Sequence, residues 1–124
     1  MAGWVSDTNA QWAVGHPVPS LQTVELFEVL IDKVGTEDWL RFRFLAPGIG
    51  KGADELSFAD VEADMAHLCE TVARPYMREH SLSADVVAIA LLDRPVSFGQ
   101  SDPEATQYID VFRVTSGACV WERL

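Results

Sequence analysis

The pattern of apolar and polar positions along the chain predicts five strands and one long helix. Between Trp39 and Leu45, apolar residues alternate with basic ones, which is typical of a strand with one buried face. Arg41 and Arg43 lie on the polar face, where we expect them to meet Glu25 or Glu28 across a hairpin. The other predicted strands, rich in Val, Ile, Leu and Phe or bounded by turn residues, are 21–34, 85–92, 107–115 and 118–124.

The helix is predicted between the second and third strands, where apolar residues recur at steps of three and four. Ser57 is a good N-cap, and Asp60 completes a short capping box. Pro75 lacks an N–H donor, so we expect a kink there, or a break followed by one more turn. The apolar stripe of this helix consists of Phe58, Val61, Met65, Leu68, Val72 and Tyr76.

The opposite side of this helix is expected to face solvent and to carry Asp60, Asp64, His67 and Thr71. Two carboxylates and an imidazole at this spacing form a weak candidate metal site of Asp60, Asp64 and His67. A charged helix face is more often simply solvated, and we favour that interpretation. No cofactor is predicted.

The element order β-β-α-β-β-β predicts an α+β domain of two layers. We expect a mainly antiparallel sheet of about five strands with the long helix packed on one face. Residues 1–20, which contain Pro17 and Pro19, are expected to form an extended N-terminal arm, and residues 21–124 a single domain.

The composition of the chain argues against some classes of function. The chain has 124 residues and a formal net charge of -10, with 19 acidic and 9 basic residues. No basic stripe is present to bind nucleic acid, and no apolar run is long enough to insert into a membrane. Residues 1–11 have neither a basic start nor an apolar run, so they are not a signal peptide. A protein partner, including a basic one, is compatible with this charge, and the oligomeric state is left open.

The two cysteines, Cys69 and Cys119, allow two interpretations. They are too few for a zinc site made of thiolates alone, so they form a disulfide or are two small core residues. We favour the disulfide, because Cys69 lies on the sheet-facing side of the helix and Cys119 on the last strand. A disulfide would indicate an oxidising compartment.

The long connection before the fourth strand contains the best candidate binding residues. Such a loop beside a sheet is a plausible recognition surface, with Phe98 exposed for a partner. The competing interpretation is that Phe98 plugs the end of the sheet and the loop only covers the core. The candidate residues are Arg94, Phe98, Gln100, Asp102, Glu104 and Gln107.

A set of short motifs resembles an uncharacterised family of small bacterial domains over residues 20–124. The motifs are LRFRFLAP at 40–47, ADMAHLC at 63–69, DRPVSFG at 93–99, PEATQ at 103–107 and GACVWE at 117–122. The resemblance implies an exported, for example periplasmic, domain with paired cysteines and no known activity. Some members carry an acetolactate synthase label, which does not fit this chain: that enzyme class needs a far larger chain with a thiamine diphosphate and magnesium site.

The favoured function is a non-enzymatic binding or assembly domain, because no convergent set of catalytic residues is visible. Two alternatives come from other classes. One is a small hydrolase or metal-dependent enzyme that uses Asp60, Asp64 and His67, or the loop acids Asp102 and Glu104. The other is an acidic inhibitor or immunity-type protein that binds a basic target, which the charge of -10 suggests.

Overall fold

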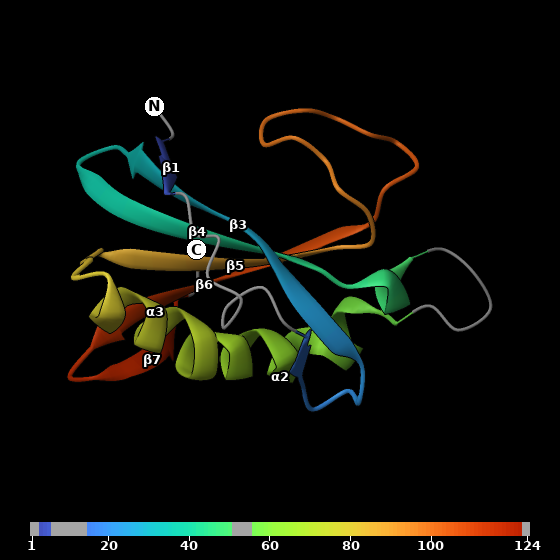
Figure 1. Ribbon diagram of the computed structural model, residues 1–124, viewed down its shortest axis with the longest axis horizontal. Helices are drawn as coiled ribbons and strands as arrows, with labels where there is room; N and C mark the ends of the chain where they lie inside the picture. The colour runs from blue at the N-terminus through green and yellow to red at the C-terminus, as the bar shows by residue number, and fades with distance from the viewer. Residues whose placement is uncertain (1–2, 6–14, 51–55, 123–124) are drawn as a thin grey trace.

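A mixed, curled sheet and one long helical segment form the two layers of the molecule (Figure 1). The computed structural model describes residues 3–5, 15–50 and 56–122. The strands of these ranges lie in the order β1-β3-β4-β5-β6-β7, and β2 also pairs with β3. The helical segment lies along one face of this sheet. The predicted α+β class and its two layers are therefore confirmed.

All five predicted strands are present. Strand β6 begins and ends at the predicted residues, and β5 begins one residue later than expected. Among the described strands, β4 and β5 pair in parallel, because the helix carries the chain back across the sheet between them; the other pairs are antiparallel. The strands are β3 (Thr23–Val34), β4 (Glu37–Leu45), β5 (Val86–Leu92), β6 (Gln107–Thr115) and β7 (Ala118–Trp121).

The N-terminal segment contributes more than the arm that we expected for residues 1–20. Strands β1 (Gly3–Val5) and β2 (Gly15–Pro17) each pair antiparallel with β3. Residues 6–14 of the expected arm lie outside the described residues. Strand β3 would otherwise leave its outer row of N–H and C=O groups unpaired, and the two short strands satisfy part of that row.

The helical segment begins with the predicted capping box. Helix α2 spans Phe58–Leu68, and Ser57 is its N-cap. The Ser57 hydroxyl accepts from the Asp60 N–H at 3.3 Å, and the Asp60 carboxylate accepts from the Ser57 N–H at 2.8 Å. The hydrogen bonds that the Ser57 N–H and the Ser57 hydroxyl donate to the Asp60 carboxylate, the backbone one first, lower the pKa of Asp60. A short 3-10 turn, η1 (Pro47–Ile49), precedes this helix in the chain.

Near Pro75 the chain has a widened turn rather than a break. A π-helical segment, η2 (Cys69–Ala73), joins α2 to helix α3 (Arg74–Glu79). The Arg74 N–H donates to the Cys69 carbonyl, five residues back, instead of four. Pro75 cannot donate to the preceding turn and its ring crowds that turn, so the wider spacing accommodates it. The three segments follow one another without interruption (Figure 1).

The hydrophobic core lies between this helical segment and the facing side of the sheet. Phe42 of β4 meets Tyr76 of α3 edge to face, with ring centroids 5.4 Å apart. Strand β5 is buried along its whole length, on both faces. The largest side chains of this core include Phe42, Phe44, Leu40, Met65, Leu68, Tyr76, Ile89 and Leu91.

Asp64 is buried, so the expectation that it lies on the solvent side of the helix is wrong. Its carboxylate accepts from the Ser20 N–H at 2.8 Å, the Ser20 hydroxyl at 2.5 Å and the Gln22 side-chain amide at 3.2 Å. These three donors replace water, which is what makes burial of a carboxylate tolerable. Between its two partner residues, Leu21 is 94% exposed and has a φ of 72°. Asp64 therefore holds a turn of unusual backbone geometry in place.

The predicted disulfide between Cys69 and Cys119 is present. It joins η2 to β7, with the two Cα atoms 6.3 Å apart. Glu70 reinforces this junction, because its carboxylate accepts from the Cys119 N–H at 2.7 Å and from Arg74 at 2.5 Å. The hydrogen bond from the Cys119 N–H is the main cause that lowers the pKa of Glu70. The helix and the edge strand are thus linked both covalently and by hydrogen bonds.

Candidate functional site

The connection between β5 and β6 is a closed loop above the sheet face that the helix leaves uncovered. At its neck the Asp93 N–H donates to the Thr106 carbonyl at 3.1 Å, and the Thr106 N–H donates to the Asp93 carboxylate at 2.7 Å. A surface loop of roughly 6–16 residues whose ends lie close together is an Ω-loop, a type that is frequently functional. It is the orange loop that rises from the sheet in Figure 1. We call residues 93–106 the Ω-loop.

Local hydrogen bonds shape the Ω-loop from within. The Gln100 N–H donates to the Ser97 carbonyl at 2.9 Å, and Gly99 between them has a φ of 83°. Only glycine adopts that φ without strain, which explains its place in this turn. Further along, the Asp102 carboxylate accepts from the Glu104 N–H at 3.0 Å. The sequence therefore builds a defined loop and not an unstructured connection.

Phe98 lies on the outer face of the sheet and not in the core. Its ring stands 5.3 Å from the guanidinium carbon of Arg41 and 5.7 Å from that of Arg43. These distances suit cation–π contacts. The ring remains 40% exposed. Of the two interpretations of this loop, the structure agrees with the exposed aromatic and not with a plug of the core.

The two arginines under Phe98 are fixed by other contacts. Arg43 is only 4% exposed; it pairs with Glu28, as predicted, and donates to the Val96 carbonyl at 2.7 Å. That last bond ties the Ω-loop to β4. Arg41 pairs with Asp32 at 2.9 Å, and not with the predicted glutamates.

Asp32 shows that this ion pair is more than a surface contact. Burial raises the pKa of the Asp32 carboxyl, but hydrogen bonds from Arg41 and from the Lys33 N–H more than offset this and lower it. The carboxylate is therefore charged across the neutral pH range. It holds Arg41 in place beside the Phe98 ring.

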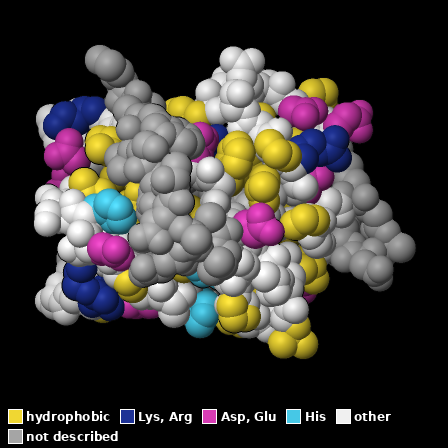
Figure 2. Space-filling view, in the orientation of Figure 1, with side chains coloured by type: hydrophobic (Ala, Val, Ile, Leu, Met, Phe, Trp, Pro, Cys, Tyr) yellow, Lys and Arg dark blue, Asp and Glu magenta, His cyan; other side chains and the backbone are white. Residues whose placement is uncertain are grey.

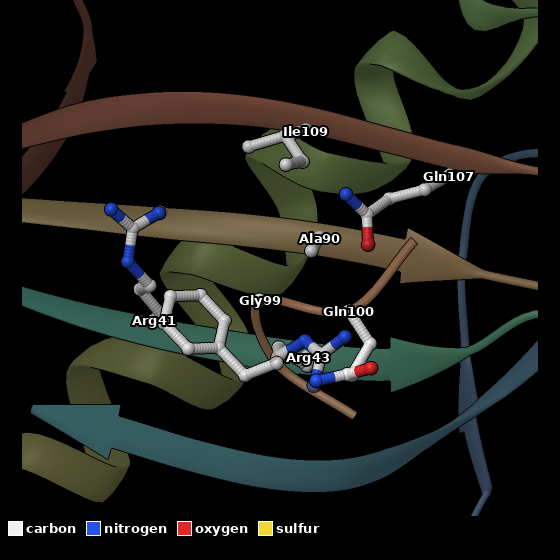
Figure 3. A pocket seen from close by; sticks show the side chains of 9 residues that line it. Arg41, Arg43, Ala90, Gly99, Gln100, Gln107 and Ile109 are labelled. Carbon is white, nitrogen blue, oxygen red and sulfur yellow. The ribbon is translucent and has the colours of Figure 1, made fainter. Parts of the chain in front are cut away.

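A groove of about 250 Å³ lies between the Ω-loop and the sheet (Figure 3). Ala88 and Ala90 of β5 form its floor, because β5 runs between β4 and β6. The rest of the groove is formed by β4 on one side, β6 on the other and the loop above, with the residues Arg41, Arg43, Phe98, Gly99, Gln100, Gln107 and Ile109.

The register of the three strands explains why a groove forms here. Arg43 lies opposite Ala90 on β5, and Ala90 lies opposite Ile109 on β6. Small side chains in the middle row, between longer ones on both sides, leave a channel along β5. Arg41 and Ala88 repeat the arrangement one step along the strand. We call this channel the alanine groove.

The structure brings together three of the six predicted binding residues. Phe98, Gln100 and Gln107 line the alanine groove, and Figure 3 shows both glutamines beside it. Arg94 instead pairs with its neighbour Asp93 at 3.1 Å. A smaller hollow of about 200 Å³ within the Ω-loop is lined by residues that include Gln100, Gln107 and Asp102.

The sequence interpretation missed the part of the groove that the sheet contributes. Glu104 lies on an exposed part of the loop and lines neither hollow. The missed residues are Arg41, Arg43, Ala88, Ala90 and Ile109. The signal for them is in strand β5, where alanines alternate with larger residues although the strand is buried on both faces.

The candidate metal residues have other places in the structure. Asp60 belongs to the capping box, Asp64 is buried against the turn at Ser20, and His67 is exposed. Within residues 3–5, 15–50 and 56–122, no three His, Cys, Asp or Glu residues are grouped closely enough to hold a metal ion. The expected shared face of these three residues is therefore not formed.

On the face shown in Figure 2, the exposed apolar side chains of the described residues do not gather into one large surface. Figure 2 shows, on the side turned to the viewer, apolar side chains in separate groups with acidic ones between them. Val120 and Trp121 on the edge strand β7 are 50% and 48% exposed. No helix of the described residues is both long and apolar enough to cross a bilayer. The alanine groove, which contains three of the predicted binding residues, is taken as the candidate site.

The chain belongs to a family of unknown function, DUF6497, whose model matches residues 2–124. The match confirms the resemblance to an uncharacterised family and extends it through most of the N-terminal segment. No curated protein and no solved structure matches the chain.

Proposed function

We propose that the protein is a non-enzymatic binding domain whose alanine groove receives an extended segment of a partner protein. The observation that carries this proposal is the position of Phe98. The Ω-loop holds this ring 40% exposed above Arg41 and Arg43, over a floor of two alanines. An aromatic ring that a loop holds partly exposed beside a groove is available to a partner.

The lining of the groove suits a peptide. The alanine floor gives room for a short apolar side chain, and Gln100 and Gln107 offer amide groups to peptide N–H and C=O groups. Arg41 and Arg43 are neutralised by Asp32 and Glu28, so they act as ordered donors more than as a site for a strong anion. Their fixed positions reduce the entropy lost on binding.

The disulfide supports an exported location for this binding domain. Disulfides persist in oxidising compartments and are rare in the reducing cytosol. The bond between Cys69 and Cys119 is compatible with such a compartment. The partner that we propose would therefore be met outside the cytosol.

A random-peptide display selection, followed by affinity measurement on the enriched peptide, tests this function. Ala90→Leu fills the groove with a larger side chain while leaving the Ω-loop intact. Ala66→Leu, on the exposed side of α2, adds the same atoms far from the groove and is the control. We expect Ala90→Leu to weaken binding of the enriched peptide at least about tenfold, and Ala66→Leu to leave it unchanged.

The proposal is supported if the peptides enriched on the native protein share a motif and need the open groove. It is overturned if no motif is enriched, or if Ala90→Leu binds the enriched peptide as tightly as the native protein does.

A further inference from the structure

A second groove lies at the other side of the sheet, between the end of α3 and the β6–β7 hairpin. We propose that it binds a small alkyl carboxylate, with the alkyl chain in the groove and the carboxylate on Arg78. This site is independent of the alanine groove. It has a volume of about 250 Å³ and is lined by Arg74, Met77, Arg78, Leu82, Val114 and Gly117.

The walls of this groove are apolar and held in place. Met77, Leu82 and Val114 supply the apolar surface, and each of them also packs against the main core. The disulfide and the Glu70 bond to Cys119 fasten the hairpin to the helix directly beside the groove. A groove of about 250 Å³ lies just below the size range of roughly 300–1,000 Å³ that is typical of ligand pockets, so it suits a small ligand. A chain of several methylene groups therefore fits.

Arg78 differs from the other basic residues of the described ranges, because its guanidinium has no ion-pair partner there. The paired ones are Lys33, Arg41, Arg43, Arg74, Arg94 and Arg113. In a chain of net charge -10, acidic partners are abundant, so an unpaired and exposed arginine beside an apolar groove is a distinctive feature. A carboxylate is the group that a guanidinium binds best.

The charge of the protein favours a small monoanion over an acidic protein surface. A net charge of -10 repels every negative partner, and the repulsion grows with the charge of that partner. A single carboxylate experiences the least repulsion. Arg74 is already engaged by Glu70, so the site offers one free cation for one negative charge. An alkyl carboxylate is small and carries one negative charge, so it meets both requirements.

Titration of the disulfide-intact protein with octanoate, followed by NMR of the methyl groups, tests the site. We expect saturable shifts of the Met77, Leu82 and Val114 methyl signals, with a dissociation constant in the millimolar range, as befits a small ligand in an open groove. Octanol has the chain without the charge, and acetate has the charge without the chain. Both should bind at least about tenfold more weakly.

The Arg78→Gln variant isolates the role of the cation. It should weaken octanoate binding about tenfold and leave the weak binding of octanol unchanged. Arg94→Gln, which removes an exposed arginine from another part of the surface, is the matched control and should bind octanoate normally. N-acetylleucine is a further probe, since it joins a carboxylate to a peptide-like body.

The inference is overturned if octanoate shifts no groove methyl signal, or if Arg78→Gln binds it as well as the native protein does. Tighter binding of N-acetylleucine than of octanoate would also overturn it, since the occupant would then be a peptide terminus and not an alkyl chain. None of these outcomes involves the alanine groove, so the proposed function is tested separately.

Discussion

The two faces of the sheet are built on different principles. On the helix side, large apolar side chains such as Phe42 and Ile89 meet the helix and leave no exposed surface. On the outer side, β5 presents Ala88 and Ala90, and β4 presents ion-paired arginines under an aromatic ring. The first face is arranged for stability, and the second leaves a groove in which another molecule can be accommodated.

Strand β5 shows this difference within seven residues. Its side chains are buried on both faces, yet those toward the helix are Val87, Ile89 and Leu91, whereas two toward the outer face are alanines. Burial alone therefore does not separate the core from a site. The size of the side chains at alternate positions of one strand distinguishes the core face from the face that forms the groove.

The largest expected effect comes from removing one aromatic ring from each face, which tests whether the two faces contribute differently to stability. Phe42→Ala should lower the free energy of unfolding by about 3–5 kcal/mol, because it leaves a cavity against Tyr76. Phe98→Ala should cost less than about 1 kcal/mol, because its ring is 40% exposed. Urea unfolding measures both variants. Equal losses would show that the Ω-loop is part of the core after all.

Reduction of the disulfide is expected to have the next largest effect. Cys69 and Cys119 are 50 positions apart in sequence, and opening the loop between them should cost about 4 kcal/mol in the chain-entropy model. Urea unfolding of the native protein and of the Cys69→Ala/Cys119→Ala variant measures this loss. Thiol titration of the denatured protein, with and without reductant, is the control. Coincident unfolding curves would show that the helix side does not need this crosslink.

The smallest expected effect concerns Glu70 and its dependence on pH. The folded-state pKa of Glu70 lies below its ordinary value of 4.5, so its contribution is complete above that pH and is lost as the pH falls through the lowered pKa. Solvent screens the side chain, which is 39% exposed, and limits the effect to a few tenths of a kcal/mol at most. Between pH 5 and pH 3, the free energy of unfolding of the Glu70→Gln variant should therefore fall slightly less steeply than that of the native protein. An unchanged slope in urea unfolding would contradict this.

The regular part of the fold could be predicted because its signals are local. The alternation around Phe42 and Arg43 defines β4, and Ser57 with Asp60 defines the start of α2. Strand β6 was predicted at its observed bounds because a proline-containing loop and a Ser116-Gly117 turn flank it. Where a local rule decides the structure, one sequence is enough.

The remaining features depend on contacts between distant residues. Asp64 has the polarity of a solvent-exposed position, but a turn 44 residues earlier supplies its hydrogen bonds. The alanine groove needs the register of three strands and a loop that returns over them, and only its loop half was predicted. The π-helical turn before Pro75 could not be predicted either. A proline can be accommodated by breaking the helix or by widening one turn, and local rules do not decide between the two.

The disulfide also determines how the molecule would respond to mechanical force. When the two ends of the chain are pulled apart, the segment between Cys69 and Cys119, which are 50 positions apart in sequence, cannot be stretched. At ~3.6 Å per residue, about 180 Å of contour length stays hidden until the bond is reduced. The parallel contact of β4 with β5 joins the extensible part of the chain to the protected part. This contact must break before β4 can be drawn away from the protected part.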